Sequence, residues 1–252
     1  MSKSTQVKTE KEIEIMKQAG QICAEALKNV LSEVKVGVSC AFLDQIAEKE
    51  IESRGASSSF KTVDDYKWTI CTTINEQVVH GIPTDYKLKD GDVLGIDIGA
   101  DFQGFHSDMA ISVPVGNVGE NAKKFLDVGR ETLKKAISKA KPGGKIGDIS
   151  QTIGDNVEKS GYQPVRILTG HGVGRELHEE PMVPCFGKGG TGPSILENMV
   201  LAIEVIYTEG SAELKLEKDS WTFSTKDGSL GGLFEQTVAV TKAGPIVLTP
   251  YL

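Results

Sequence analysis

The stretch DGDVLGIDIGADFQGFHSDMAISV, residues 90–113, contains two runs of strand-forming residues joined by a short polar connection. Asp97 lies inside the first run and Asp108 inside the second. Strands this apolar are usually covered on both faces, so an acid within one is costly unless it is paired or bound to metal. A hairpin would bring the two carboxylates together. The stretch therefore predicts an antiparallel strand pair that holds two acids side by side.

A second strand pair repeats the first one later in the chain. Residues 197–204, ENMVLAIE, align with residues 90–97, and residues 234–240, FEQTVAV, align with residues 107–113. The acids that this alignment superimposes are Asp97 with Glu204 and Asp108 with Glu235. Residues 213–229 fall between the strands of the second pair, where a longer hairpin connection is tolerated. Each half therefore offers two strands, and each strand carries one carboxylate.

Helical patterns precede the strand pair in both halves. Apolar residues recur at helical spacing over residues 10–32, and a second stripe begins after Ser39, which suits an N-cap, and can end at Gly55. The second half repeats this order with a helix over about 119–140 and a further helix that ends near Gly161. We interpret the two halves as an internal pseudo-repeat of helix pairs and strand pairs.

The repeat sets the expected domain organisation. Residues 1–9 are polar, and we expect them to be flexible. We expect residues 10–252 to form a single domain with halves of about 10–118 and 119–252. A chain of 252 residues buries roughly three quarters of its unfolded surface, which is enough for one sizeable core.

Composition and charge exclude several classes of protein. The chain has 28 Lys and Arg against 35 Asp and Glu, a net charge of −7, which argues against specific nucleic-acid or anionic-membrane binding. No apolar run reaches the ~18 residues of a membrane span, and the N terminus lacks the apolar core of a secretory signal. The four cysteines, scattered without a CxxC pair, are typical of reduced thiols in a cytosolic protein.

Four carboxylates would then meet around the pseudo-two-fold axis: Asp97, Asp108, Glu204 and Glu235. Four anions in one apolar core cannot all remain ionised without compensation, and no cluster of Lys or Arg lies in these strands. Any one of these acids alone would be interpreted as a solvated edge-strand carboxylate. Their repeat-related positions instead indicate divalent cations, and carboxylates with an imidazole suit Mn, Fe, Co or Zn.

The chain contains four histidines, and three have a setting that favours function. His171 lies in TGHGVGR, where small neighbours allow the ring to approach a crowded centre, and His178 follows seven residues later. His80 lies in VVHGIP. His106 has no such context, and we expect it to be an ordinary core or surface imidazole.

These motifs, taken in order, resemble those of the pita-bread metallopeptidases. The residues that carry the resemblance are Asp97 and Asp108 with ten residues between them, GHGVGR at 170–175, Glu204 and Glu235. The runs TTINE at 72–76, VHGIP at 79–83 and GHGVGRELHEEP at 170–181 are similar specifically to type I methionine aminopeptidases. The resemblance covers about residues 10–250. It implies an α/β (α+β) pita-bread fold, in which a curved antiparallel sheet is covered by two pseudo-symmetry-related helix pairs.

The resemblance implies a ligand set for two divalent metal ions, drawn from Co, Mn, Fe and Zn. The implied ligands are Asp97, Asp108, His171, Glu204 and Glu235. Asp108 and Glu235 would bridge the ions, Asp97 would hold one of them, and His171 and Glu204 the other. Two cations ~3.5–4 Å apart lower the pKa of a bridging water, which then attacks the first peptide bond.

The resemblance also implies which groups act on the substrate. Glu204 would accept the proton of the attacking water. His178 would hydrogen-bond the substrate carbonyl or the developing oxyanion, and His80 the scissile nitrogen or the backbone of the next residue. The free α-amine of the substrate would reach the second ion, which restricts the reaction to N termini.

The methionine side chain would bind in a pocket that Tyr66, Cys71 and Trp221 line by the same resemblance. An apolar slot lined by sulfur and aromatic rings suits a thioether. Simple packing explains Tyr66 and Trp221 equally well at this stage. The chain departs from the family at several pocket positions, which bear on how strictly methionine is preferred: Phe60, Val63, Leu177 and Val205.

The expected protein is therefore a cytoplasmic methionyl aminopeptidase, a dinuclear metal-dependent hydrolase in protein maturation. It would remove the initiator methionine from newly made polypeptides. We expect a monomer that binds neither specific nucleic acid nor membranes. Its action on newly made polypeptides would bring it into transient contact with the ribosome.

Two other functions compete with this one. An Xaa-Pro peptidase shares the five ligands, and Asp97-Ile98-Gly99 is a small point in its favour, but such enzymes normally carry an additional N-terminal domain. A non-catalytic binding protein could reuse the fold, although it would be expected to have lost metal ligands. Metal analysis, together with a comparison of cleavage rates on Met-peptides and Xaa-Pro peptides, distinguishes these three functions.

Overall fold

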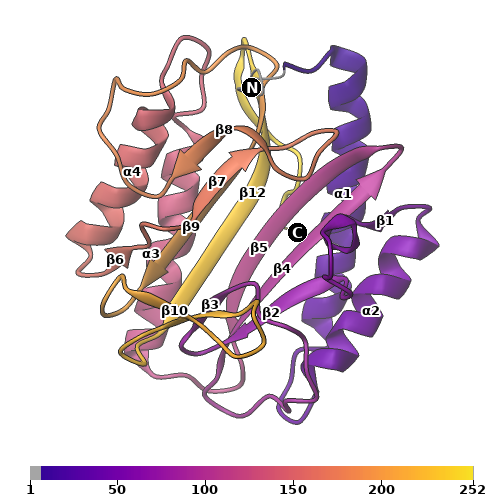
Figure 1. Cartoon of the computed structure of the whole chain (residues 1–252), viewed down its shortest axis with the longest axis vertical. Coiled ribbons are helices and arrows are strands. Elements are labelled where there is room, and N and C mark those ends of the chain that lie inside the picture. Colours follow the sequence, from indigo (N-terminus) through magenta and orange to yellow (C-terminus); the bar gives the residue numbers. More distant parts are fainter. Residues whose placement is uncertain (1–6, 252) are drawn as a thin grey trace.

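One curved antiparallel sheet dominates the computed structural model, which describes residues 7–251, and four α-helices flank and back it (Figure 1). All neighbours on its main path pair antiparallel. This path runs through β1 (Ser57–Ser58), β4 (Val93–Phe102), β5 (Phe105–Pro114), β12 (Gly231–Thr241), β9 (Val200–Thr208), β7 (Thr169–Gly172) and β8 (Glu179–Pro184). Three further strands extend the sheet, namely β2 (Ile70–Ile74) beside β4, β6 (Gln163–Pro164) beside β9, and β13 (Gly244–Val247) beside β12.

The hairpin predicted from residues 90–113 is confirmed as β4 and β5. The two strands are joined by Gln103 and Gly104, whose φ angles are 54° and 77°. Two consecutive residues with positive φ form a type I′ turn, whose twist matches that of the flanking strands. The pairing runs without a register shift from Phe102 opposite Phe105 to Val93 opposite Pro114.

The extra residues of the second half form a small second sheet. In place of a simple connection after β9, the chain forms β10 (Leu214–Leu216) and β11 (Phe223–Thr225), and β11 pairs with β3 (Gln77–Val79) of the first half. A short 3-10 helix at Phe60–Thr62 contacts β4 of the main sheet. The insertion therefore joins the two halves at one end of the molecule.

The helices begin and end largely where the sequence predicts. They are α1 (Glu10–Ser32), α2 (Cys40–Ser53), α3 (Glu120–Ile137) and α4 (Ile146–Lys159). Ser39 caps α2, as predicted, by accepting a hydrogen bond from the backbone N–H of Phe42. Gly55 and Gly161, at φ of 75° and 88°, follow the C-caps of α2 and α4, where a left-handed residue closes the last turn.

The helices cover the sheet in pairs. In the first pair α1 packs on β4 and β5, and in the second α3 packs on β9 and β12. Gly129 allows α3 its close approach, because a Cβ atom there would lie 2.4 Å from the ring of Phe234 on β12. The predicted arrangement, a curved antiparallel sheet covered by two helix pairs, is confirmed (Figure 1).

The pairing register corrects the predicted equivalence of Asp108 and Glu235. Glu204 lies directly opposite Glu235, whereas Asp97 lies opposite Ala110. Ala110 is therefore the counterpart of Glu235, and Asp108 lies two residues before it on β5. Because alternate residues of a strand point to the same face, a shift of two leaves Asp108 on the same face as the other acids.

Residues 1–6 of the expected flexible segment 1–9 lie outside the described residues. The three that follow are attached to the body of the protein. Thr9 begins α1 through a capping box with Glu12, and the side chain of Lys8 is buried in an ion pair with Glu179. The chain is thus held at Lys8, ahead of the first helix.

The apolar core lies between the sheet and the helices. In the second half the ring of Phe125 on α3 stacks on that of Tyr207 on β9, with centroids 4.3 Å apart. The Tyr207 hydroxyl donates a hydrogen bond of 2.5 Å to the backbone oxygen of Phe125. Within residues 7–251, none of the helices combines the length and the hydropathy needed to cross a bilayer.

Truncation of Phe125 should show how strongly this core depends on its aromatic pair. We expect Phe125→Ala to lower the free energy of unfolding by about 3–5 kcal/mol, because it leaves a cavity against Tyr207. Urea unfolding followed by circular dichroism measures the change. The matched control is Phe42→Ala on α2. The Phe42 side chain is 45% exposed, so this substitution should lower the free energy of unfolding by less than about 0.5 kcal/mol. Equal losses in the two variants would contradict this assignment of the core.

Candidate metal centre

Five neighbouring strands of the sheet each supply one of the predicted ligands. In spatial order, β4 carries Asp97, β5 Asp108, β12 Glu235, β9 Glu204 and β7 His171. The first two strands belong to the first half of the chain and the other three to the second half. The candidate centre therefore lies across the junction of the two halves, where β5 meets β12.

The register places three of the acids in one row across the sheet. Asp97 lies opposite Ala110, Ala110 opposite Glu235, and Glu235 opposite Glu204. Residues in such a row share a face and lie one strand spacing apart, about 4.8 Å. The small side chain of Ala110 leaves open space between Asp97 and Glu235.

Asp108 and His171 lie one step along the strands from this row. Asp108 comes two residues before Ala110 on β5, and His171 pairs with Ala202, two residues before Glu204 on β9. Both steps are of two residues, so both side chains emerge on the same face as the row. The five predicted ligands thus point to one region of the concave side of the sheet.

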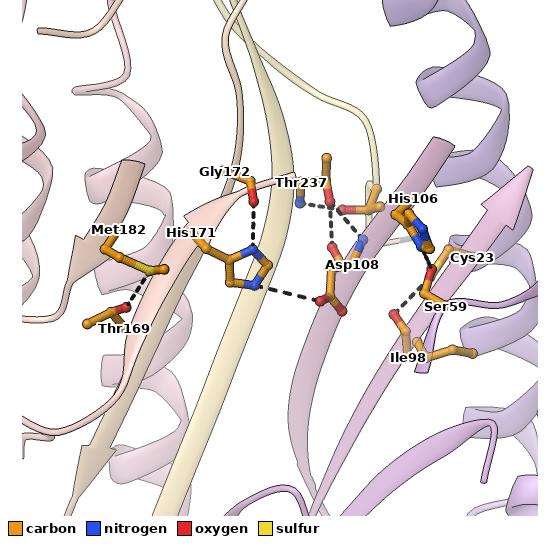
Figure 2. Close-up of polar contacts among 11 residues, drawn as sticks. Cys23, Ser59, Ile98, His106, Asp108, Thr169, His171, Gly172, Met182 and Thr237 are labelled. Carbon is orange, nitrogen blue, oxygen red and sulfur yellow. Dashed lines mark hydrogen bonds and ion pairs between the residues drawn. The ribbon is translucent and has the colours of Figure 1, made fainter. Parts of the chain in front are cut away.

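Local hydrogen bonds orient Asp108 and His171 toward each other (Figure 2). The Thr237 hydroxyl accepts from the backbone N–H of Asp108 at 2.9 Å and donates to its carbonyl oxygen at 2.7 Å. His171 Nδ1 lies 2.9 Å from the backbone oxygen of Gly172. Because a carbonyl can only accept, Nδ1 carries the proton and Nε2 keeps its lone pair. Nε2 faces Asp108 Oδ2 at 3.9 Å.

The donor atoms are close together and incompletely satisfied. One ligand atom each of Asp108, His171 and Glu235 lies within 4.8 Å of the other two. Among the described residues, Asp97 Oδ1, Asp108 Oδ1 and Glu235 Oε1 are buried without any hydrogen-bond partner. Buried polar atoms are normally satisfied, and a bound ion is one of the few explanations for a group that is not.

Burial raises the pKa of all four carboxyl groups, and the charges of neighbouring acids raise the pKa of three of them further. Desolvation raises the pKa of Asp97 to about 7, partly offset by a hydrogen bond from Asp108. Desolvation and then the charge of Asp97 raise the pKa of Glu204 to about 8. The pKa values of Asp108 and Glu235 lie well above their usual range, first because of desolvation and then because of the neighbouring acids. Without a cation, this group of acids therefore retains protons near neutral pH.

The donor set fits a divalent transition metal. Desolvation, and then the neighbouring His178, lower the pKa of His171 to about 3, so its ring is neutral and available as a ligand. Carboxylate oxygens with one neutral imidazole are the donors that Mn, Fe, Co and Zn accept. A metal would also pair the orphaned carboxylate oxygens and remove the repulsion between them.

All ten predicted site residues line one cavity of about 310 Å³ in front of these strands. They are Tyr66, Cys71, His80, Asp97, Asp108, His171, His178, Glu204, Trp221 and Glu235. Three of the four residues that depart from the family pattern, Phe60, Val63 and Leu177, line it too, whereas Val205 does not. The structure brings these residues together from separate stretches in both halves of the chain.

The cavity also contains residues that the sequence analysis did not identify. Ile167, Leu168 and Thr169 approach from the segment that enters β7, and Ile206 and Leu233 project from the central strands. Ile167 is 64% exposed at the cavity wall, although it is a large apolar side chain. Apolar residues in strands and loops give no local signal of site membership, since the same pattern serves the core.

Two histidines reach the cavity from turns. His80 follows β3 with a positive φ of 56°, a strained conformation for a non-glycine residue that is typical of functional sites. Desolvation, and then His178, lower the pKa of His80 to about 4. His178 is exposed to the cavity, and its ring lies 4.4 Å from that of His171. His106 lies outside the cavity and contacts the Ser59 hydroxyl at 2.9 Å (Figure 2).

An apolar cluster closes one side of the cavity. The ring of Tyr66 packs edge-on against Trp221 at 5.0 Å and against Trp68 at 5.3 Å. The Tyr66 hydroxyl lies 3.1 Å from Cys71 Sγ, which places a sulfur and a phenol on the same wall. Tyr66 and Trp221 therefore pack against each other and also line the cavity. Trp68 supports the wall and was not identified from the sequence.

Comparison with known proteins gives consistent results at the levels of sequence and structure. Residues 14–242 match the profile of metallopeptidase family M24. The chain is 43% identical over 242 residues to methionine aminopeptidase 1 of Bacillus subtilis, which covers 96% of this chain and 98% of that protein. The crystal structure of a methionine aminopeptidase from Thermotoga maritima is similar with a TM-score of 0.96 and 39% identity, over 98% of this chain and 99% of that one.

A more distant similarity reaches the prolidases. The prolidase from Pyrococcus furiosus gives a TM-score of 0.80 at 24% identity, and the match covers 97% of this chain but 65% of that one. This likeness concerns the fold alone. Together with the Thermotoga maritima structure, it confirms the predicted pita-bread architecture.

The raised pKa values predict an unusual pH dependence for the metal-free protein. Folding raises the pKa of these acids above their unfolded values of about 4, so the folded state binds more protons than the unfolded chain. The lowered pKa values of the buried histidines oppose this effect below about pH 7, where the unfolded histidines bind protons, so we expect the stability of the metal-free protein to fall as the pH rises from about 7 to 9. Added Mn²⁺ replaces the protons, so it should raise Tm more at pH 8 than at pH 6. Calorimetry with and without Mn²⁺ measures both effects.

Glu235→Gln provides the control for this experiment. The amide removes one acid at nearly constant shape, so the metal-free variant should lose less stability than the wild type between about pH 7 and 9. Its Tm should respond little to Mn²⁺. A full Mn²⁺ response in this variant would show that the ion binds elsewhere.

Proposed function

The chain belongs to metallopeptidase family M24, and from this premise we propose that it is a methionine aminopeptidase that removes the initiator methionine from newly made polypeptides. The observation that carries the proposal is the convergence of four acids and one neutral imidazole from five adjacent strands on a cavity with an apolar wall. The extent of the similarity to methionine aminopeptidases, over 96% of the chain, supports it.

We propose that the centre holds two divalent ions. Asp108 and Glu235 would bridge them, Asp97 would bind one, and His171 with Glu204 the other. When bound, such ions supply a Lewis acid that lowers the pKa of the nucleophilic water and polarises the scissile carbonyl. Since both halves contribute ligands, residues 10–252 would act as one catalytic domain. Co, Mn, Fe and Zn all suit this donor set.

The side chains of the protein would handle protons and the oxyanion. Glu204 would accept a proton from the attacking water, because its carboxylate lines the cavity directly beside Glu235, a proposed bridging ligand. His178, exposed to the cavity, would hydrogen-bond the substrate carbonyl as negative charge develops on its oxygen. His80 would hold the scissile nitrogen or the backbone that follows it, from a turn whose φ of 56° fixes the direction of the ring.

The apolar wall would receive the methionine side chain. Tyr66, Cys71 and Trp221 offer aromatic faces and a sulfur atom, which are good partners for a thioether. Phe60 and Leu177 are buried in the same cluster, with 6% of each exposed, so they help set its volume. Their bulk determines how strictly the wall selects methionine over shorter or branched side chains.

We also propose where the enzyme acts and with which partners. We propose a cytoplasmic location, because the new polypeptides that begin with methionine are made there. The four cysteines, all buried free thiols, suit such a reducing compartment. The same substrate would bring it transiently to the ribosome. We propose that it acts as a monomer, without specific nucleic-acid or membrane binding.

A peptide panel tests this function against its rivals. We expect the Mn²⁺-loaded protein to release methionine from Met-Ala-Ser and to leave Xaa-Pro peptides of the same length uncut, because the apolar wall binds the first side chain. Chromatography of the products measures both rates. Preferred cleavage of Xaa-Pro peptides would favour an Xaa-Pro peptidase, and absence of both metal uptake and cleavage would favour a binding protein.

Two histidine variants test the separate roles of metal binding and substrate contact. His171→Ala should lose activity together with bound metal, because it removes the only nitrogen ligand of the proposed set. His178→Ala should keep its metal, and its kcat should be lower by about 10²–10³-fold, the usual effect of removing an oxyanion donor. Metal analysis alongside kcat on Met-Ala-Ser distinguishes them. Loss of metal from His178→Ala would place that ring among the ligands instead.

A further inference from the structure

The segment that carries His178 is a turn between two strands. Residues 173–178 connect β7 to β8 and bring Leu177 and His178 to the cavity. One end of the turn is tied to the sheet, since the Gly174 oxygen accepts a hydrogen bond of 2.7 Å from the N–H of His106. The ring of His178 itself is exposed to the cavity, so its position depends on how the turn is held from behind.

A buried ion pair lies at the other end of this turn. Lys8 Nζ contacts Glu179 Oε2 at 2.5 Å, and the two side chains are only 4% and 5% exposed. The second oxygen of Glu179 accepts the backbone N–H of Glu176 at 3.3 Å, within the turn. Glu179 directly follows His178 in the chain. Its carboxylate therefore fixes the backbone on both sides of the histidine.

Lys8 is itself firmly placed beneath the turn. Its backbone N–H donates to the Asn198 oxygen at 2.8 Å, next to the start of β9. Its aliphatic stem lies against Gly174, where a Cβ atom would come within 2.2 Å of Lys8 Cε. The ammonium group thus reaches Glu179 from the N-terminal segment, 171 positions away in the sequence.

Stability alone is a poor explanation for this pair. A buried ion pair often adds no more stability than an apolar pair of the same size, because both charges must be desolvated. It does impose a defined geometry on the groups that carry it. A second ion pair, Arg175 with Glu12, joins the same turn to α1 at 2.9 Å, but Arg175 is 60% exposed and contributes little.

We propose that Lys8 and Glu179 are positioning residues for His178. The pair locks the 173–178 turn so that the imidazole is held ready for the substrate carbonyl, a role that rests on the proposed function. The ion pair would fix the positions of side chains on this turn only, and the positions of the metal ligands on the strands would be unaffected. A displacement of about 1 Å at a catalytic group can cost ~10²-fold in rate.

A double-mutant cycle tests the proposal. We expect Lys8→Met to lower kcat on Met-Ala-Ser by about 10–100-fold, with KM changed much less and metal content unchanged. In a His178→Ala background, Lys8→Met should have almost no further effect on kcat, because the group that it positions is already gone. Arg175→Gln is the matched control on the same turn, and its kcat should stay close to that of the wild type.

Three results would overturn the proposal. One is a loss in kcat that is undiminished in the His178→Ala background. Another is an unchanged kcat in Lys8→Met. Should Lys8→Met not fold, Glu179→Gln, which keeps the shape and one acceptor, replaces it in the same cycle, and failure of both to fold would assign the pair to stability. Wild-type protein that cleaves no Met-peptide would instead refute the proposed function itself, before any variant is compared.

Discussion

Repulsion among four carboxyl groups in one dry space is the constraint on which this structure depends. Asp97, Asp108, Glu204 and Glu235 lie on the concave side of the sheet, where desolvation raises all four pKa values and neighbouring acids raise those of Asp108, Glu204 and Glu235 further. Protons relieve this repulsion by neutralising carboxylates, and divalent cations relieve it by binding them. The second is chemically useful, because cations held by such donors act as Lewis acids at neutral pH. The neutral imidazole of His171 adds a donor without adding charge.

Much of this centre can be predicted from sequence because each acid interrupts an apolar strand. An acid such as Glu204 inside LAIEVIY has no ordinary explanation in a covered strand, and the repeat multiplies the signal. The same alignment was wrong about Asp108 and Glu235, which differ by two positions in register. A shift of two preserves both the face and the hydrophobic pattern, so periodicity cannot reveal it.

Other features leave no local trace in the sequence. The ion pair of Lys8 and Glu179 joins residues that only the fold brings together, and Lys8 looks like part of a polar, solvated terminus. The hydroxyl of Thr237 replaces backbone pairing beside Asp108 and reads in sequence as an ordinary strand threonine. The inserted strands β10 and β11 were expected to be a connection, yet β11 pairs with β3, and Trp221 between the two strands reaches the cavity. These contacts arise from tertiary packing, which local propensity does not encode.

One centre is assembled from side chains on five strands. The strands that carry these side chains therefore tolerate insertions poorly, whereas the connections between strands tolerate them well. A residue inserted anywhere within β4 or β5 would turn Asp97 or Asp108 to the helix-covered side, because successive side chains of a strand alternate. Residues added between β9 and β12 carry no such penalty, and there the chain has two strands of the small second sheet. Evolution can therefore remodel the entrance of the cavity by lengthening loops, while the spacing along the central strands must stay constant.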